Sequence, residues 1–353
     1  MNTYSDPAKR GVNKFLLAGV FFLVAAAGLY YVKWHPYYLK AFKSATTHSI
    51  GASIITGKAA SAPVPSWNAA VGYAAAYFKA VWQAVVLGLM LGSLVQVLIP
   101  RDWVKRVLGS TGFGSTVAGG AVALPGMMCT CCAAPVTVGL RKRSASVGAA
   151  LAFFLANPVL NPATLIFMGF VLSWKFTIYR LVFGVILVFG IALLANRLFK
   201  EEQAADSPLS TVDEAAAETG SFLRRWLRAL GQLIIDTIPA YVIVVFVLGF
   251  ARAWLFPAIG PTGLNGTLAI IGLAIAGTLF VIPTAAEIPV VQTLMGFGLG
   301  AGPAGALLLT LPAVSLPSLL IVKRGFSARV LVFTAVAVAV LGIVGGLVAG
   351  VVL

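Results

Sequence analysis

A chain of 353 residues that is 60% hydrophobic and only 10% charged has the composition of a membrane protein rather than of a large soluble domain. Its net charge of +15 does not indicate nucleic-acid binding, because the lysines and arginines stand in short groups between apolar runs, the pattern of cytoplasmic loops. The chain has only two histidines, both near the N-terminus, which argues against a histidine metal site. Its three cysteines are clustered and do not form a disulfide framework. We expect no cofactor.

The first apolar run, residues 15–34, follows three basic residues. This order predicts an N-terminal transmembrane helix within residues 1–34, with a cytoplasmic N-terminus. The small residues 25–27 leave a cleaved signal peptide as the alternative. Residues 35–69 form a polar connection to the rest of the chain.

The rest of the chain contains an internal repeat. Spacings of 13 and then 10 residues occur twice, in Pro135, Gly148 and Pro158 and again in Pro289, Gly302 and Pro312. A further proline follows each set, Pro162 in the first and Pro317 in the second. The repeat predicts two permease-like halves, residues 70–199 and 222–353, joined by an acidic cytoplasmic linker at 200–221.

The basic clusters predict how each half crosses the membrane. To keep Arg101, Arg141 and Arg197 on the cytoplasmic side, residues 113–140 must enter and leave from one side, as a re-entrant hairpin, and Arg324 then falls on the same side. Residues 266–296 are the equivalent segment of the second half. Full crossings are then expected at 70–99, 145–172, 176–198, 229–256, 303–322 and 327–353. Three crossings per half make the two repeats inverted, and the predicted fold is an all-α polytopic membrane protein of the bacterial inner membrane.

A sulfur-rich cluster, Met127-Met128-Cys129-Thr130-Cys131-Cys132, lies inside the first re-entrant segment. Thiolates and thioethers are ligands for soft cations and metalloids, so Met128 and the cysteines are candidate substrate-binding residues, with Cys129, Cys131 and Cys132 as metalloid ligands. If a half-helix begins near Thr130, Cys129 and Cys132 share a face and Cys131 points about 100° away. Alternatively, the cysteines are small packing residues.

The prolines mark breaks in apolar segments, which membranes tolerate where protein or a water-filled cavity surrounds them. Paired breaks in two repeats indicate the central site of a transporter. The predicted breaks at the site are Pro135, Pro158, Pro162, Pro289, Pro312 and Pro317. Asn157 and Asn161 beside them either present amides to a substrate or satisfy the carbonyls that the prolines free. Ser315 is a further candidate, with a hydrogen bond inside its own helix as the alternative.

Two acidic residues in the second half are candidates for coupling or for a counter-charge. Glu287 lies in the second re-entrant segment, where a carboxylate predicts a proton carrier or a partner for a cation; its alternative is pairing with backbone or an arginine. Asp236 follows Arg228 by eight residues, about 12 Å along a helix, so solvation at the cytoplasmic surface is its alternative.

The run CTCCAAPVTVGLRKRSASVGAALAFFLANPVLNPAT from Cys129 resembles the signature of a bacterial predicted-permease family that includes the ArsP-type organoarsenical efflux permeases. The run PTAAEIPVVQTLMGFGLGAGPAGALLLTLPAVSLPSLL from Pro283 resembles its second signature. The resemblance spans about Tyr77 to Leu353. It implies a permease, with members that export trivalent organoarsenicals through cysteines at the positions of Cys129, Cys131 and Cys132. Serine is common in the family where this chain has Thr130 and Cys132.

The leading functional hypothesis is a secondary transporter that exports a small soft solute, most simply a trivalent arsenical or related metalloid. A phosphate-binding GxxxxGK[ST] loop is missing from the sequence, so a gradient of ions, such as protons, or of the substrate supplies the energy. The first alternative is a permease for a sulfur-containing or other small anion, held by half-helix N-termini. A membrane thiol oxidoreductase is the alternative of another class, and predicts an exposed CxxC-type pair and a partner site. The expected partners are the substrate and membrane lipid, with no nucleic acid.

Overall fold

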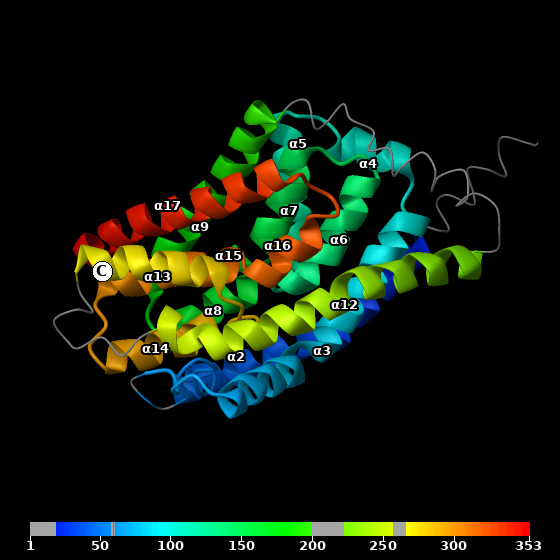
Figure 1. Cartoon of the computed structure of the whole chain (residues 1–353). Coiled ribbons are helices and arrows are strands. Elements are labelled where there is room, and N and C mark those ends of the chain that lie inside the picture. Colours follow the sequence, from blue (N-terminus) through cyan, green and yellow to red (C-terminus); the bar gives the residue numbers. More distant parts are fainter. Residues whose placement is uncertain (1–18, 58, 60, 200–221, 257–265) are drawn as a thin grey trace, which may run out of the picture.

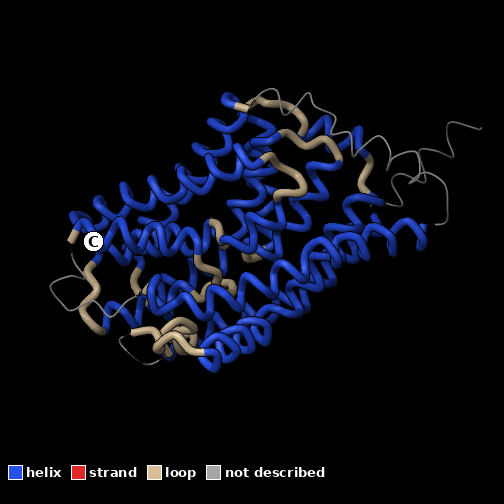
Figure 2. The backbone as a smooth tube through the Cα atoms, in the orientation of Figure 1, coloured by secondary structure: helices blue, strands red, loops and turns tan. Residues whose placement is uncertain are grey.

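The computed structural model describes residues 19–57, 59, 61–199, 222–256 and 266–353. Within these ranges the regular elements are helices, and the β-structure is one isolated bridge between Ser53 and Gly57. Figure 2 shows loop segments in the middle of the helical body as well as at its ends. The predicted linker 200–221 and the start of the first helix lie outside the described residues. The all-α membrane fold expected from the composition is confirmed.

The N-terminal helical segment is longer than the hydrophobic run predicted. Residues 19–29 are helical, continue through a π-helical turn (η1, Tyr30–Trp34) and pass into α2 (His35–Thr47). The expected end at Trp34 is therefore the middle of a continuous helix, and the polar connection begins only after Thr47.

The two halves share a series of elements, a long helix, a hairpin of two short helices, a broken helix and a second long helix, and the first half contains α4 and η2 in addition (Figure 1). The first half contains α3 (Trp67–Leu98), α4 (Arg101–Leu108), α5 (Phe113–Ala123), η2 (Leu124–Gly126), α6 (Thr130–Lys142), α7 (Val147–Val159), α8 (Pro162–Val171) and α9 (Trp174–Leu198). The second contains α12 (Phe222–Leu255), α13 (Thr267–Leu279), α14 (Glu287–Gly296), α15 (Ala301–Ala313), α16 (Leu316–Val322) and α17 (Ala328–Val352).

Six helical segments in the described residues are long and apolar enough to cross a membrane, and they coincide with the six predicted crossings. They are 67–98, 147–171, 174–198, 222–255, 301–322 and 328–352. Two of them contain a break, at 160–161 and at 314–315.

The short hairpins return to the end from which they start. Their helices, at about 1.5 Å per residue, are about 15–20 Å long, and the hydrocarbon core is about 30 Å thick. At the open end of the first hairpin, the Ser146 N–H donates to the Leu108 carbonyl over 2.7 Å. At the open end of the second, Gly302 lies against Ile270. The segments 113–140 and 266–296 are therefore helical hairpins.

The last long helices of the two halves, α9 and α17, run in opposite directions. Phe199, after the end of α9, packs on Phe333 near the start of α17, with ring centroids 5.6 Å apart. Tyr179, near the start of α9, packs with Ala349 near the end of α17. Since the first hairpin opens beside the end of α9 and the second beside the end of α17, the hairpins enter from opposite ends.

Basic residues from several helices gather at one end of the molecule. Arg101 donates to Ser144, Arg141 donates to the Gly325 carbonyl, and Arg143 donates to the Gln96 carbonyl. Arg324 lies next to Gly325 in the chain. Arg101 and Arg141, from which the hairpin was deduced, thus lie at one end together with Arg324, which was expected on the same side.

Four of the six predicted proline breaks are present. Pro158 and Pro312 stand in the last turns of α7 and α15, and Pro162 and Pro317 begin the helices that follow.

The predictions for Pro135 and Pro289 were wrong, because both lie inside continuous helices. Pro289 is the third residue of α14. A backbone N–H at this position has no acceptor within the helix, so proline removes no helical hydrogen bond. Pro135 lies in the middle of α6, where its backbone packs against Gly92 of α3, a glycine that leaves room for this close approach.

Candidate functional site

The helix that carries the cysteines begins in the middle of the molecule, where it meets a helix start from the other half. Cys129 is the extended N-cap residue of α6, and Ser315 is the extended N-cap residue of α16. The hydroxyl oxygens of Thr130 and Ser315 are 3.3 Å apart. The breaks in the apolar segments therefore bring two helix N-termini, 185 residues apart in sequence, into contact.

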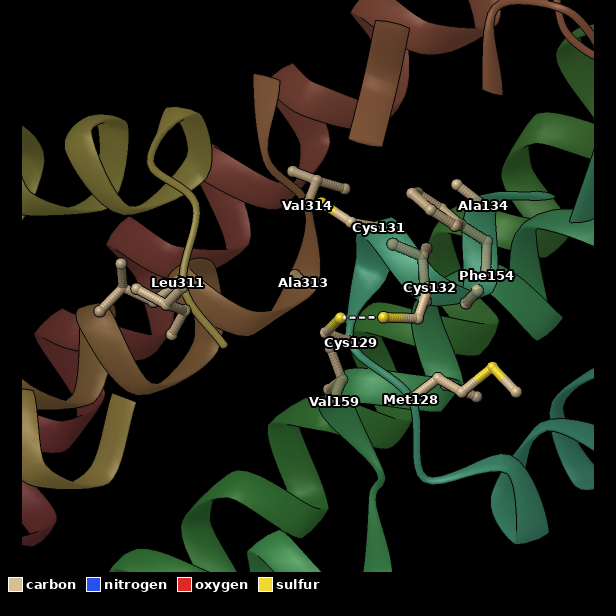
Figure 3. Packing of buried hydrophobic residues seen from close by; sticks show 14 of the residues in the cluster. Met128, Cys129, Cys131, Cys132, Ala134, Phe154, Val159, Leu311, Ala313 and Val314 are labelled. Atoms are coloured by element: carbon tan, nitrogen blue, oxygen red, sulfur yellow. Dashed lines mark hydrogen bonds between the residues drawn. The ribbon is translucent and has the colours of Figure 1, made fainter. Parts of the chain in front are cut away.

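Cys129 and Cys132 form a close pair of thiols, with their sulfur atoms 2.8 Å apart (Figure 3). Both side chains are buried, Cys129 4% and Cys132 0% exposed. The pair arises because the N-cap and third helical positions of a first turn share one face. This is the face that the sequence predicted.

Cys131 lies on a different side of α6 from the pair. Its sulfur is 3.8 Å from the Ser315 hydroxyl and interacts with the hydroxyls of Tyr77 and Tyr241. The described residues contain no group of three or more histidine, cysteine or acidic side chains arranged to hold a metal ion. The prediction of three convergent cysteines is therefore corrected to a pair, since a regular first turn keeps Cys131 apart.

The two tyrosines beside Cys131 come from opposite halves of the chain. Tyr77 of α3 and Tyr241 of α12 have hydroxyl oxygens 2.7 Å apart and both side chains are buried. This contact joins the first long helix of each half directly behind the cysteine helix.

A lysine from the N-terminal segment reaches the cysteine pair. Lys33, in the π-helical turn η1, is 4% exposed and interacts electrostatically with Cys129 and Cys132. Its ammonium group donates to the hydroxyls of Tyr37 and Thr284, each over 3.2 Å. Thr284 precedes α14, so the second hairpin also contributes to the site.

Met128 and Asn157 support the backbone before α6. The Met128 N–H donates to the Asn157 side-chain oxygen over 3.3 Å, and the Asn157 amide donates to the Phe153 carbonyl over 3.0 Å. Asn157 therefore bonds backbone groups, but neither is the carbonyl that Pro158 frees, which is that of Phe154, four residues before the proline.

Asn161 is the N-cap of α8, so its side chain satisfies N–H groups at the helix start rather than carbonyls that the prolines free. Its side-chain oxygen accepts from the N–H groups of Ala163 and Thr164. Its buried side-chain nitrogen has no hydrogen-bond partner among the described residues.

Glu287 pairs with a buried arginine that the sequence analysis did not identify. The Arg180 Nη1 and Glu287 Oε1 atoms are 2.5 Å apart, and the side chains are 0% and 2% exposed. Arg180 also donates to the carbonyls of Pro158 and Val159, beside the break between α7 and α8. The arrangement compensates the carboxylate charge and satisfies backbone oxygens freed by the break.

Asp236 lies at a surface and not at the centre. Its carboxylate is 3.0 Å from Arg324, in a pair whose side chains are 58% exposed for the arginine and 17% for the aspartate. It also accepts from Gln232. This position agrees with the alternative that Asp236 is solvated at the surface.

Both hairpin tips contain a non-glycine residue in the left-handed region, Met127 with φ 47° and Ala285 with φ 67°. Such residues cost about 1–3 kcal/mol each, and functional sites are where they concentrate. Met127 and Ala285 lead into Cys129 and Glu287, respectively, so both charged or reactive centres follow a strained tip.

The described central residues that sequence reasoning missed are Lys33, Arg180, Thr284 and the tyrosine pair. Lys33 and Arg180 carried a usable signal, since each is a basic residue with apolar neighbours on both sides in a helix, where charge indicates function. The tyrosines and Thr284 carried no distinguishing pattern.

A family of predicted permeases, the ArsP type, matches residues 125–351. The chain belongs to this permease family. The matched range includes the cysteine pair, Arg180 and Glu287, and it excludes Lys33. The six apolar helices and the family together identify a multi-pass membrane permease.

Three relatives match the chain over different lengths. UPF0718 protein YraQ of Escherichia coli K12 is 55% identical over 93% of both chains. UPF0718 protein MJ0584 of Methanocaldococcus jannaschii is 24% identical over 68% of this chain and 84% of the relative. UPF0718 protein YcgR of Bacillus subtilis 168 is 25% identical over 34% of this chain and 41% of the relative. No solved structure matches the chain.

Proposed function

We propose that this permease is a secondary transporter that exports trivalent organoarsenicals or related soft metalloids across the bacterial inner membrane. The observation that carries the proposal is the Cys129–Cys132 pair, with sulfurs 2.8 Å apart at a buried helix start. Two thiols on one helical face can hold a single soft atom, and sulfur prefers soft partners over the hard ions that oxygen sites select.

Movement of the substrate requires the central site to open to each side in turn. We infer that the halves act as inverted repeats, which is the usual basis of alternating access. The opposite directions of α9 and α17 and the entry of the two hairpins from opposite ends support this inference. Both cysteines of the pair are buried, so the described conformation corresponds to a closed site.

The proposed orientation has a cytoplasmic N-terminus. The common end formed by Arg101, Arg141, Arg143 and Arg324 is then the cytoplasmic end, because positive residues are retained there. In this account Glu287 is the counter-charge of Arg180, and a coupling role would require this pair to separate during transport. Asp236 remains at the cytoplasmic surface.

A small sulfur-containing anion is the second candidate substrate. Lys33 supplies a buried positive charge, and Cys129 makes no side-chain capping bond to the first turn of α6. An anion could therefore accept from those backbone N–H groups.

A thiol oxidoreductase is less well supported. Cys129 and Cys132 have CxxC spacing at a helix start, as redox pairs do, but both are buried, whereas that hypothesis requires an exposed pair.

Uptake into everted membrane vesicles distinguishes the candidates. Vesicles would be given trivalent methyl- and phenylarsenicals, antimonite and thiosulfate, with vesicles lacking the protein as the control. The proposal predicts accumulation of the trivalent arsenicals above the control and none of thiosulfate. Accumulation of thiosulfate alone would identify the anion permease. Accumulation of none of the solutes, together with oxidation of Cys129 and Cys132 that depends on a membrane quinone, would identify the oxidoreductase.

A further inference from the structure

The N-terminal segment, residues 29–48, contacts the hairpin tips of both halves. The Trp34 Nε1 atom donates to the Pro125 carbonyl over 2.7 Å, at the tip of the first hairpin. The Lys33 ammonium donates to the Thr284 hydroxyl over 3.2 Å, at the tip of the second. Two consecutive residues of one helix therefore bond to the tips of hairpins that enter from opposite ends.

The same segment contacts both halves again near its end. The His48 Nδ1 atom lies 2.8 Å from the Phe170 carbonyl of α8, and Gln292 of α14 donates to the His48 carbonyl over 3.0 Å. The Tyr37 ring packs edge-on against Phe167 of α8, with ring centroids 5.8 Å apart. The N-terminal segment is thus bonded to the first and to the second half at two separate levels.

Each tip contact lies beside a strained residue. Met127, with φ 47°, follows Pro125 by two residues, and Ala285, with φ 67°, directly follows Thr284. A left-handed backbone at such residues persists only where surrounding contacts hold it. Met127 leads into the cysteine helix α6 and Ala285 leads into α14. The two contacts therefore help to hold the starts of both helices in place.

Burial shows that the N-terminal segment turns one face to the protein. Leu29 and Lys33 are 8% and 4% exposed, whereas Tyr30 and Tyr31 are 50% and 77% exposed. Lys33 and Trp34 both lie in the π-helical turn η1, and such turns are frequent at functional sites. Burial of an ammonium costs free energy that an apolar side chain would not cost, so packing alone does not account for a lysine on this face.

We propose that the N-terminal segment is a gate of the central site, and that the contacts of Trp34 and Lys33 with the two hairpin tips keep it closed. The inference rests on the proposed transport by alternating access. In that mechanism one half moves against the other, so a helix bonded to both tips must release at least one of them. The gate precedes residues 125–351, the range matched by the permease family.

A gate of this kind sets the population of the open conformation. A hydrogen bond that is made only in the closed conformation lowers the open population by its net contribution. Loss of one such bond should raise the open population by about three- to tenfold. Cys129, Cys131 and Cys132 are free and buried, so their reaction with a thiol reagent reports opening of the site.

The test is the rate at which N-ethylmaleimide labels the native cysteines of the purified full-length protein at a fixed pH. Trp34→Phe removes the indole donor and keeps an aromatic ring, and Thr284→Val removes the acceptor of Lys33 and keeps the side-chain shape. Each variant should be labelled about three- to tenfold faster than wild type, and the double variant faster than either. Tyr38→Phe, at a position of α2 that is 64% exposed, is the matched control and should be labelled at the wild-type rate.

A second reporter separates opening of the site from a general loosening of the protein. Val338→Cys puts a thiol at a fully buried position of α17, in a chain whose three native cysteines are replaced by serine. The gate predicts that Trp34→Phe leaves the labelling rate at this position unchanged. Equal acceleration there and at the native cysteines, or no acceleration at the native cysteines, would overturn the gate. Thr284→Val decides in the same way if Trp34→Phe does not fold.

The labelling requires no substrate, so failure of the gate and failure of the proposed function are distinguishable. Faster labelling of the variants, together with no arsenical uptake by wild type, would contradict the proposed substrate alone. Arsenical uptake by wild type, together with unchanged labelling of the variants, would contradict the gate alone.

Discussion

Arg180 and Glu287 form a buried ion pair, 2.5 Å from Nη1 to Oε1, that connects α9 of the first half with the start of α14 in the second. The same guanidinium donates to two carbonyls beside the break between α7 and α8. The pair thus stabilises an interrupted helix with a charge contributed by the other repeat.

Removing one partner of this pair should destabilise the protein strongly. In Glu287→Gln the Arg180 charge is left buried without compensation, at a cost of about 3–5 kcal/mol. Thermal unfolding in detergent should show a clearly lowered Tm. The double variant Arg180→Met/Glu287→Met should lose less stability than Arg180→Met and Glu287→Met lose in sum. Additive losses would contradict the pairing.

Asp236 provides the contrasting case. Its partner Arg324 is 58% exposed, and exposed pairs contribute about 0–1 kcal/mol. Asp236→Asn should therefore leave the Tm and the transport rate nearly unchanged. A large loss of transport with normal stability would restore Asp236 as a coupling residue.

The glycines of α3 allow the cysteine helix to approach closely. A Cβ at Gly88 would collide with the Cys132 carbonyl, whereas a Cβ at Gly72 on the same helix meets nothing within 4 Å. Gly88→Ala should cost about 1–3 kcal/mol through overpacking and should impair transport by displacing the thiol pair. Gly72→Ala is the matched control and should be neutral or stabilising. Equal behaviour of the two variants would show that this contact does not position the site.

The hydrogen bond between the Tyr77 and Tyr241 hydroxyls should contribute measurably to the free energy of unfolding, because both groups are buried. Tyr77→Phe and Tyr241→Phe should each lower stability by about 0.5–1.5 kcal/mol, since each removes the bond between the hydroxyls and leaves the other hydroxyl only the Cys131 sulfur. The double Phe variant should lose less than the sum. Differential unfolding of the three variants in detergent provides the values, and simple additivity would argue against a direct bond.

The fold was predictable where a local signal decides the structure. Uninterrupted apolar runs marked the six crossings, and the prolines after Asn157 and Ser315 marked the two breaks. The face shared by Cys129 and Cys132 followed from helix periodicity alone. Pro135 was misjudged because its accommodation depends on a glycine of α3, a tertiary feature that local reasoning does not contain.

The electrostatic partners were not predictable in the same way. Arg180 and Glu287 are separated by 107 residues, and Lys33 and Thr284 by 251, so only the packed structure brings them together. Charge in an apolar helix identified Glu287 as important but did not identify its partner. The same rule, applied to Lys33 and Arg180, would have added both to the candidate site.

The central claim is that Cys129 and Cys132 hold the transported soft solute. It is tested most directly by uptake of a trivalent phenylarsenical into everted vesicles containing wild type, Cys129→Ser, Cys132→Ser or Cys131→Ser at matched protein levels. The account predicts that uptake falls to background in the first two variants and remains largely intact in Cys131→Ser, whose sulfur faces the tyrosines. Equal uptake in all four proteins would contradict the account and reduce the thiol pair to packing.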